Sequence, residues 1–236
     1  KDIQKDEFLD TVTHELRTPI TAIRAATEIL HDDDDELPNE LRKQFLKSII
    51  SESDRLNRLI DKILDLEKFE TGKHKIYLSK NNISKTIKNT IDSVIQLINN
   101  KNIAIIFNEA SEEIKAFYDE ERIIQVVHNL LSNAIKFCPT KDGEITITVT
   151  ENNKDIAVLI HNNGKGIKVE EFEPIFDKFY QSRNQNVKKP VGSGLGLAIC
   201  KQIIEHHKGN IWVESDHTNG ATFIFTLPNY NTPEKQ

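Results

Sequence analysis

The chain has 236 residues, a formal net charge of −6, 37% hydrophobic residues and 29% charged residues. These values indicate one large or two small soluble domains, and the acidic balance gives no general reason to bind nucleic acid. No apolar run approaches membrane-spanning length, and no secretory signal is recognisable. The chain contains no methionine, so we expect a cytoplasmic fragment of a longer protein, with any membrane anchor in the missing parts. Cys138 and Cys200 have no metal-site or redox spacing and are expected to be reduced thiols in or near the core.

The first predicted helix runs from about Asp2 to His31 and contains the stretch FLDTVTHELRTPI. Its apolar residues recur at spacings of three, four or seven, as in a helix seam; they are Leu9, Val12, Leu16, Ile20, Ile23 and Leu30. His14 lies off this seam, so we expect its imidazole to be open to solvent. A neutral imidazole is a nucleophile near neutral pH, and Glu15 is placed to hydrogen-bond one ring nitrogen. A surface histidine without a function is the alternative that this stretch alone leaves open.

An acidic run from Asp32 to Glu36, followed by Pro38, separates this helix from a second one that extends to about Glu70. We interpret the run as a solvated turn, with a metal site as the less favoured alternative. The second helix keeps a heptad-like apolar rhythm at Phe45, Ile49, Leu56, Leu59, Ile63 and Leu66. Two long helices joined by a short turn form an antiparallel hairpin. One hairpin cannot bury such wide apolar faces, so residues 1–70 are predicted to form a four-helix bundle in a symmetric homodimer.

The pattern changes after Gly72, a residue type expected just past a helix end. Residues 71–79 are predicted to be a linker with a short strand at Lys75–Leu78, and residues 229–236 a polar tail. Residues 80–228 alternate helices and strands, which predicts an α+β sandwich with helices on one side of a mixed or antiparallel sheet. The predicted helices are Ile83–Ile98, Glu120–Phe137 and Leu195–His207. The predicted strands are Ile103–Phe107, Ile114–Tyr118, Glu144–Thr150, Asp155–His161, Ile211–Ser215 and Ala221–Leu227.

Polar side chains share one face of the helix that contains HNLLSNAIKF. Asn129, Asn133 and Lys136 are spaced at i, i+4 and i+7, which places them above one another on a helix. Two amides and an ammonium suit a triphosphate with Mg²⁺, because Mg²⁺ keeps most of its waters and takes few protein oxygens. A polar face turned to solvent is the alternative that this helix alone favours.

Two glycine-containing stretches follow. In HNNGKGI, residues 161–167, Gly164 and Gly166 allow a close approach of backbone or of a flat ring. In VGSGLGLAI, residues 191–199, glycines precede a helix whose first N–H groups are free to bind phosphate. The stretch between them, residues 172–190, offers an aromatic anchor and then a basic polar segment with Arg183, Lys188 and Lys189, which is typical of a mobile lid. Each stretch alone is equally compatible with a turn or a surface loop.

Together these stretches resemble the sensor histidine kinases of bacterial two-component systems over nearly all of residues 5–228. HELRTPI resembles the phospho-acceptor box, HNLLSNAIKF the asparagine box, and HNNGKGI and GSGLGLAI the two glycine boxes. FEPIFDKFY resembles the phenylalanine box, and NGATFIFTLP the closing glycine/threonine strand. Each box is modest by itself, but this order after a two-helix hairpin is highly specific.

The resemblance implies that the second domain binds ATP with Mg²⁺ and transfers the γ-phosphoryl group to Nε2 of His14, while Glu15 accepts a proton or orients the ring. An aspartate of a response-regulator receiver domain then takes the phosphoryl group. Thr18, in H-E-x-x-T, implies a regulator phosphatase activity, with a small structural residue as the alternative. Asn133 and Asn129 are the implied metal ligands. The implied ATP-binding residues are Asn129, Asn133, Lys136, Asn162, Gly164, Gly166, Ile167, Phe176, Lys178, Tyr180, Gly192, Gly194, Leu195, Gly196, Leu197 and Thr222.

Two asparagines bear on the chemistry. Asn129 stands where the related gyrase- and chaperone-type ATPases have a glutamate base; an amide is no base, so we expect slow hydrolysis and transfer to His14. Asn162 stands where the family usually has an aspartate that accepts a hydrogen bond from the adenine amino group. The amide loses the charge, worth roughly 1 kcal/mol, so nucleotide binding is predicted to be weaker and guanine less strongly excluded. A degenerate dimeric nucleotide-binding module without transfer, and an ATPase machine, are the competing hypotheses.

Overall fold

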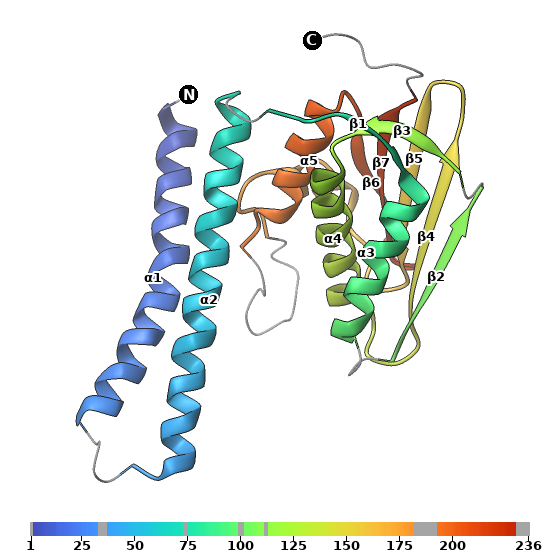
Figure 1. Cartoon of the computed structure of the whole chain (residues 1–236). Helices are drawn as coiled ribbons and strands as arrows, with labels where there is room; N and C mark the ends of the chain where they lie inside the picture. Colours follow the sequence, from blue (N-terminus) through green and yellow to red (C-terminus); the bar gives the residue numbers. More distant parts are fainter. Residues whose placement is uncertain are drawn as a thin grey trace.

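The computed structural model of the chain describes residues 2–32, 37–72, 75–98, 102–110, 113–181 and 193–229. Its first two elements are the long helices α1 (Asp2–Asp32) and α2 (Asn39–Glu70), which lie side by side as an antiparallel hairpin (Figure 1). The helix α1 continues through Pro19. The acidic turn, where a metal site was the less favoured alternative, lies largely outside the described residues at 33–36.

Five strands form one mixed sheet in the order β2-β4-β5-β7-β6. Only the β2–β4 pair is parallel, and the other neighbours in this sheet are antiparallel. The strands are β2 (Ile103–Glu109), β4 (Gly143–Glu151), β5 (Asp155–Asn162), β6 (Ile211–Glu214) and β7 (Ala221–Pro228). The mixed sheet was among the predicted possibilities, and the positions of these strands agree with the sequence patterns to within two residues.

A separate two-stranded ribbon joins the linker to the sheet domain. Its strands β1 (Ser79–Asn82) and β3 (Lys115–Tyr118) pair antiparallel, with Ser79 opposite Tyr118. The strand expected at Lys75–Leu78 is therefore wrong in position, because backbone pairing with β3 starts only at Ser79. The preceding helix α2 ends where predicted, and Gly72 follows it with a positive φ of 63°.

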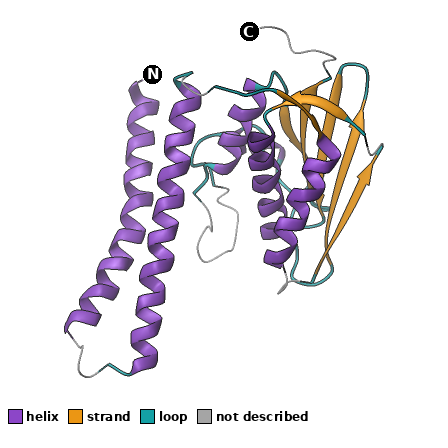
Figure 2. Ribbon diagram, viewed as in Figure 1, coloured by secondary structure: helices purple, strands orange, loops and turns teal. Residues whose placement is uncertain are grey.

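Three helices cover one face of the sheet, as the α+β prediction requires (Figure 2). They are α3 (Ile83–Ile98), α4 (Glu120–Phe137) and α5 (Gly196–His206). Two short 3₁₀ turns, η1 (Val169–Glu171) and η2 (Pro174–Phe176), lie between β5 and α5 in the sequence. The helix α4 begins at the N-cap Asp119, whose side chain accepts a hydrogen bond from the Arg122 N–H, which satisfies one of the unpaired donors at a helix start.

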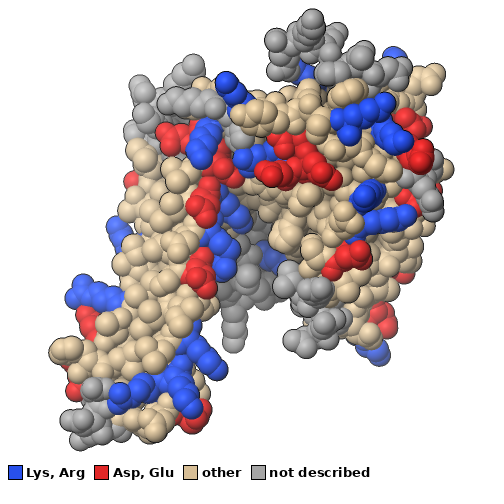
Figure 3. Space-filling view, viewed as in Figure 1, with Lys and Arg blue, Asp and Glu red and all other residues tan. Residues whose placement is uncertain are grey.

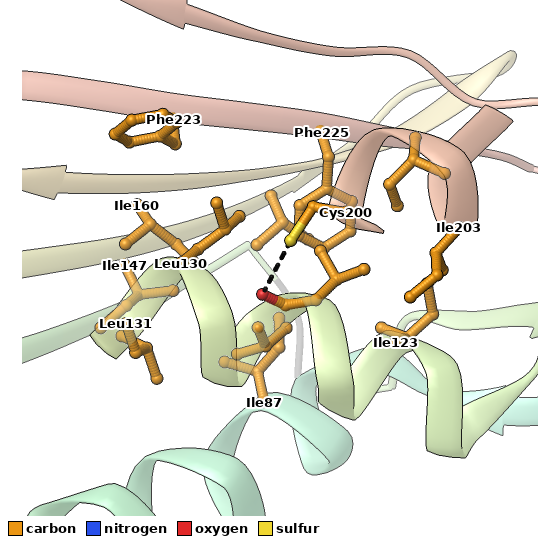
Figure 4. Close-up of a cluster of buried hydrophobic side chains, with 14 of the residues drawn as sticks. Ile87, Ile123, Leu130, Leu131, Ile147, Ile160, Cys200, Ile203, Phe223 and Phe225 are labelled. Carbon is orange, nitrogen blue, oxygen red and sulfur yellow. Dashed lines mark hydrogen bonds between the residues drawn. The ribbon is translucent and has the colours of Figure 1, made fainter. Parts of the chain in front are cut away.

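The core lies between the sheet and these helices. In β5 every second side chain is buried, and these side chains meet Leu130 and Leu131 of α4 in one apolar cluster (Figure 4). Both cysteines are free and buried, as expected, and the Cys200 thiol donates to the Val126 carbonyl oxygen at 3.9 Å. This packing fixes α4 and α5 against each other and thereby sets the distance between their polar faces.

The hairpin docks on the sheet domain through the C-terminal half of α2. Leu66 and Phe69 are each 1% exposed, and the Phe69 ring lies edge-on to His206 of α5, with the ring centroids 5.2 Å apart. Beside them, Asp65 accepts hydrogen bonds from Arg122 Nη1 at 3.4 Å and from Gln125 Nε2 at 3.3 Å. One face of α2 is therefore already used by contacts within the chain.

Other parts of the hairpin surface keep large apolar side chains in solvent. Among the hairpin side chains whose exposure is described, Ile50 is the most exposed, at 62%, and the others of this kind are Leu9, Ile20, Ile29, Leu41, Leu46, Ile60 and Leu64. Leu46 and Ile50 are four residues apart, as are Ile60 and Leu64, so each pair lies on one face of α2, and contiguous exposed apolar patches mark interaction sites. None of the described helices is both long and apolar enough to cross a membrane.

Candidate functional site

His14 lies on α1 and projects into solvent. Its side chain is 77% exposed, whereas that of Glu15 is 22% exposed. The Glu15 Oε1 atom lies 4.0 Å from His14 Nδ1, which is longer than a hydrogen bond. The carboxylate is thus on the Nδ1 side of the ring, and Nε2 is the ring nitrogen placed for nucleophilic attack. One turn further, the Thr18 hydroxyl donates to the His14 carbonyl oxygen at 3.3 Å.

A second group of polar side chains lines one face of α4. Asn129 and Asn133 are half-buried, and Lys136 is exposed at the end of this row. Partial burial nevertheless lowers the pKa of the Lys136 ammonium, whose nitrogen lies 4.6 Å from the centroid of the Phe137 ring. The three side chains share the helix face that their spacing predicted, beside the start of α5.

Asn162 ends β5 with its side chain on the helix-covered face of the sheet. It is 3% exposed, and its Nδ2 atom is buried without a hydrogen-bond partner among the described residues. Leaving such a donor unpaired costs roughly 1–3 kcal/mol. On the neighbouring strand β7 the residue directly opposite Asn162 is Ala221, whose methyl group cannot form a hydrogen bond. A ligand that accepts a hydrogen bond at this point would remove that cost.

Glycine is needed at two positions next to Asn162 because the backbone packs too closely for a side chain. A Cβ at Gly164 would lie 2.0 Å from the Phe137 carbonyl oxygen, and one at Gly166 would lie 2.5 Å from His217 Cα. Ile167 follows, and its N–H donates to Ser215 Oγ at 3.0 Å. The first glycine stretch therefore runs tightly along the C-terminal end of α4, beside the row of polar side chains.

The second glycine stretch opens α5 next to the same row. Gly194 has a positive φ of 67°, and its carbonyl oxygen accepts from the Phe179 N–H at 3.0 Å. A Cβ at Gly196 would lie 3.6 Å from Asn129 Oδ1, so the helix start and the Asn129 amide are neighbours. Leu195 is buried and Leu197 half-buried. Gly192 and the basic residues Arg183, Lys188 and Lys189 lie outside the described residues.

The structure does not bring every expected residue to this place. Phe176 is a core residue whose ring packs edge-on against Phe223. Lys178 forms a salt bridge with Glu70 of α2, and the Tyr180 hydroxyl donates to Glu171 Oε1 at 3.0 Å. Thr222 lies on the sheet face away from the helices, where its hydroxyl pairs with His161 Nδ1 at 2.9 Å.

A cavity of about 700 Å³ separates α1 from the sheet domain. Its walls come from Thr11 and Glu15 on one side and from Lys168, Glu171, Phe179 and Gln181 on the other. Of its lining residues, only Glu15 and Tyr180 were predicted to be site residues. The others could not be predicted, because the cavity exists only when the hairpin docks on the sheet domain, and no sequence spacing encodes that contact.

The chemistry of the residues on α4, β5 and α5 fits a nucleoside triphosphate. A buried amide without a partner is suited to the edge of a base, which presents hydrogen-bonding atoms. Free N–H groups at a helix start next to the α4 amides suit phosphate oxygens. The amide oxygens of Asn129 and Asn133 are hard ligands of the kind that Mg²⁺ takes.

Comparisons with known proteins agree with this arrangement. Residues 4–72 match the His Kinase A (phospho-acceptor) domain family. Residues 118–231 match the family of histidine kinase-, DNA gyrase B- and HSP90-like ATPases. The first match covers the hairpin with His14, and the second covers α4, β5 and α5.

Individual relatives align over nearly the whole chain. The sensor protein SrrB of Staphylococcus aureus is 35% identical over 96% of the chain, and the sensor histidine kinase WalK of Bacillus subtilis is 31% identical over 96%. The chain spans only 38% and 37% of the length of these two relatives.

Solved structures show the same fold. The histidine kinase ThkA, solved in complex with the response regulator protein TrrA, is 31% identical, with a TM-score of 0.76 over 98% of this chain and 63% of that one. Its catalytic domain, solved alone, is 32% identical, with a TM-score of 0.58 over 65% of this chain and 98% of that one.

Proposed function

This chain belongs to the sensor histidine kinases of bacterial two-component systems, and from that membership we propose that it phosphorylates itself on His14 with ATP. The phosphoryl group then passes to an aspartate of a response-regulator receiver domain. The single observation that carries the proposal is the exposed imidazole with a carboxylate beside it. It lies on the same chain as the amides, glycines and helix start on α4, β5 and α5.

The nucleotide half of the proposal rests on α4, β5 and α5. Asn162 would hold the edge of the base, and Gly164 and Gly166 would let the ring approach the backbone. The N–H groups at the start of α5 would hold phosphate oxygens. Asn133 and Asn129 would hold Mg²⁺, which supplies charge neutralisation to the phosphates when it is bound. Lys136, at the end of this row, would add a positive charge.

His14 and Glu15 carry the transfer step. The lone pair of Nε2 forms a bond to the γ-phosphorus, and the bond from that phosphorus to the β,γ-bridging oxygen breaks, so that ADP leaves with the oxygen. The proton on Nδ1 then passes to the Glu15 carboxylate, which lies on that side of the ring. The gap of 4.0 Å has to shorten by roughly 1 Å to reach hydrogen-bond length.

Asn129, which lies beside the start of α5, favours phosphoryl transfer to His14 over hydrolysis of ATP. Asn129 offers an amide at a point where a general base for water would have to be, and an amide has no basicity at neutral pH. Water in the pocket therefore stays a poor nucleophile, whereas the imidazole of His14 is a good one.

The partners follow from the surface of the hairpin. We expect residues 1–70 to form a homodimer, supported by the exposed apolar side chains around Ile50. A response regulator as partner is supported by ThkA, which was solved in complex with the response regulator protein TrrA. Thr18 would help to dephosphorylate that regulator, because its hydroxyl lies one turn from His14. We place this region in the cytoplasm and the sensing part, with any membrane anchor, in the remainder of the full-length protein.

Labelling with γ-³²P-ATP and Mg²⁺ tests the proposal. The chain should acquire label that is stable to alkali and lost in acid, and His14→Gln should abolish it. His31→Gln is the matched control, because His31 is a second exposed histidine on α1 with a carboxylate neighbour, Asp32. Absence of label in the unchanged chain, with ATP bound, would favour the degenerate module; fast phosphate release without label would favour an ATPase.

A further inference from the structure

We infer that the catalytic domain phosphorylates the histidine of its own chain, and that the cavity between α1 and residues 168–181 is the space in which the transfer occurs. The inference rests on the proposed function and adds to it the identity of the accepting protomer. In a dimer with two equivalent histidines, this choice depends on which hairpin the nucleotide-binding loops face.

The cavity joins the two reactive parts within one chain. On the hairpin side its wall includes Thr11 and Glu15, which are four residues apart and so lie on one face of α1. His14 precedes Glu15 in the sequence and is one turn from Thr11, and its own side chain is exposed to solvent rather than part of the cavity wall. The base proposed for the transfer therefore faces the catalytic domain of its own chain.

The opposite wall belongs to the loops that hold the nucleotide. Lys168 lies two residues beyond Gly166 of the first glycine stretch, and the Phe179 backbone is hydrogen-bonded to Gly194 of the second. The cavity wall is thus connected to both glycine stretches, through the sequence to the first and through a backbone hydrogen bond to the second. Its volume of about 700 Å³ is within the range of roughly 300–1,000 Å³ that ligand sites occupy, so a triphosphate tail has room without separating the domains.

Contacts along α2 hold the catalytic domain on this side. Asp65 is bonded to Arg122 and Gln125 of α4, and Glu70 forms a salt bridge with Lys178. Lys178 is the residue before Phe179, so the Glu70 contact fixes the segment that forms the cavity wall. These contacts hold the catalytic domain against α2, and in this position residues 168–181 and α1 form the two walls of the cavity.

The charges of the cavity disfavour a bare triphosphate more than a metal-bound one. Three carboxylates line it, from Glu15, Glu170 and Glu171, against one ammonium, from Lys168. A bare triphosphate would be repelled, whereas its Mg²⁺ complex carries two negative charges fewer. Figure 3 shows acidic and basic side chains facing each other along the junction of hairpin and sheet domain on the side it views.

Two mixed dimers of differently tagged chains test the inference. In the first, one chain carries His14→Gln and the other Asn133→Ala, so each lacks one half of the reaction. We expect no label on either chain. In the second, an unchanged chain is paired with a chain that carries both substitutions, and we expect label on the unchanged chain. Label on the Asn133→Ala chain of the first dimer would overturn the inference.

A cross-link gives an independent readout that does not require activity. With Thr11→Cys and Gln181→Cys on opposite walls of the cavity, a bismaleimide should join the two cysteines within one chain; Cys138 and Cys200 are buried and serve as the background. A product of twice the chain mass in place of the internal cross-link would contradict the inference. Failure of the unchanged chain to label at all would instead remove the proposed function while the cross-link result stood.

Discussion

Asn162 and Ala221 lie directly opposite each other on β5 and β7, on the sheet face that the helices cover. The amide nitrogen of Asn162 is buried without a hydrogen-bond partner in the part of the chain that the structure describes, and the methyl group of Ala221 cannot accept a hydrogen bond. The pair therefore leaves a polar group at the inner end of the candidate nucleotide site that a bound ligand could satisfy. This relationship makes Asn162 the residue through which base recognition is best tested.

Asn162→Asp is expected to tighten binding of ATP. A charged acceptor for the adenine amino group is worth roughly 1 kcal/mol more than a neutral one, which is about a fivefold change in the dissociation constant. The preference for ATP over GTP should rise as well, because a carboxylate cannot donate to the guanine carbonyl. Isothermal titration with both nucleotides measures this.

The matched control for that substitution is Asn153→Asp, which makes the same chemical change at an exposed position between β4 and β5. It should leave both dissociation constants unchanged. Equal affinities for ATP in Asn162→Asp and the unchanged chain would show that residue 162 does not contact the base.

The stability of the catalytic domain is expected to fall in acid because of His207. This buried side chain accepts a hydrogen bond from the Asp119 N–H at Nε2 and contacts the Ile203 carbonyl oxygen through Nδ1, which requires the neutral ring. Burial lowers its pKa, with His206 acting in the same direction and the Ile203 carbonyl and Asp119 opposing it. The unfolded chain, with a pKa near 6.5, therefore binds the proton first as the pH falls.

The free energy of unfolding that the neutral His207 ring contributes is fully present above about pH 6.5. It decreases below that pH, by up to roughly 1.4 kcal/mol per pH unit. Urea unfolding at pH 7.5 and 5.5 measures the loss. His207→Gln should reduce the difference between the two pH values, because an amide does not titrate. His206→Gln, at the neighbouring half-buried position, should retain most of the difference, and an equal reduction in both variants would refute the assignment.

Reversing one charge of the Glu70–Lys178 salt bridge is expected to loosen the docking of the catalytic domain on α2. Both side chains are more than a third exposed, so the pair contributes at most about 1 kcal/mol, and Lys178→Glu replaces attraction by repulsion. Small-angle scattering at low salt should give a larger radius of gyration. The double variant Glu70→Lys with Lys178→Glu should restore the original value; no restoration would mean that the salt bridge does not hold the domains.

Ile50→Asp is expected to weaken the proposed dimer. Ile50 is the most exposed large apolar side chain of the hairpin outside residues 1–8, whose exposure is not described, and burying an isoleucine contributes roughly 1.5–3 kcal/mol per chain. Sedimentation equilibrium should show a dissociation constant raised by at least tenfold. Ser51→Asp introduces the same charge one residue away on another face of α2 and should have a smaller effect; unchanged association in Ile50→Asp would place the dimer contact elsewhere.

Much of the fold was predictable because its signals are local. The polar row at Asn129, Asn133 and Lys136 shares a helix face because the period of α4 dictates it, and α3 and α4 begin and end at the predicted residues. The family was recognisable from the order of its boxes, and the comparisons confirm it. The strand β1 was misplaced because its limits depend on a partner strand that is 33 residues away even at their closest pairing, Asn82 with Lys115.

Contacts between residues far apart in the sequence were beyond the reach of sequence patterns. Lys178 was expected at the nucleotide but pairs with Glu70, and Thr222 was expected there but pairs with His161 across the sheet. In both cases the sequence motif lies near the site along the chain, but tertiary structure sets the direction of the side chain. For Lys178 the cause is the docking of α2, and for Thr222 it is the alternation of side chains along β7.

Counting the two products of a single turnover distinguishes phosphoryl transfer to His14 from hydrolysis of ATP. The chain, in slight excess over γ-³²P-ATP with Mg²⁺, is quenched at successive times, and protein-bound label and free inorganic phosphate are measured in the same sample. We predict that label appears on the protein first, approaches one phosphoryl group per ATP consumed, and depends on His14, with inorganic phosphate appearing only slowly. Inorganic phosphate released at the rate of ATP loss, with no label on His14, would contradict the account.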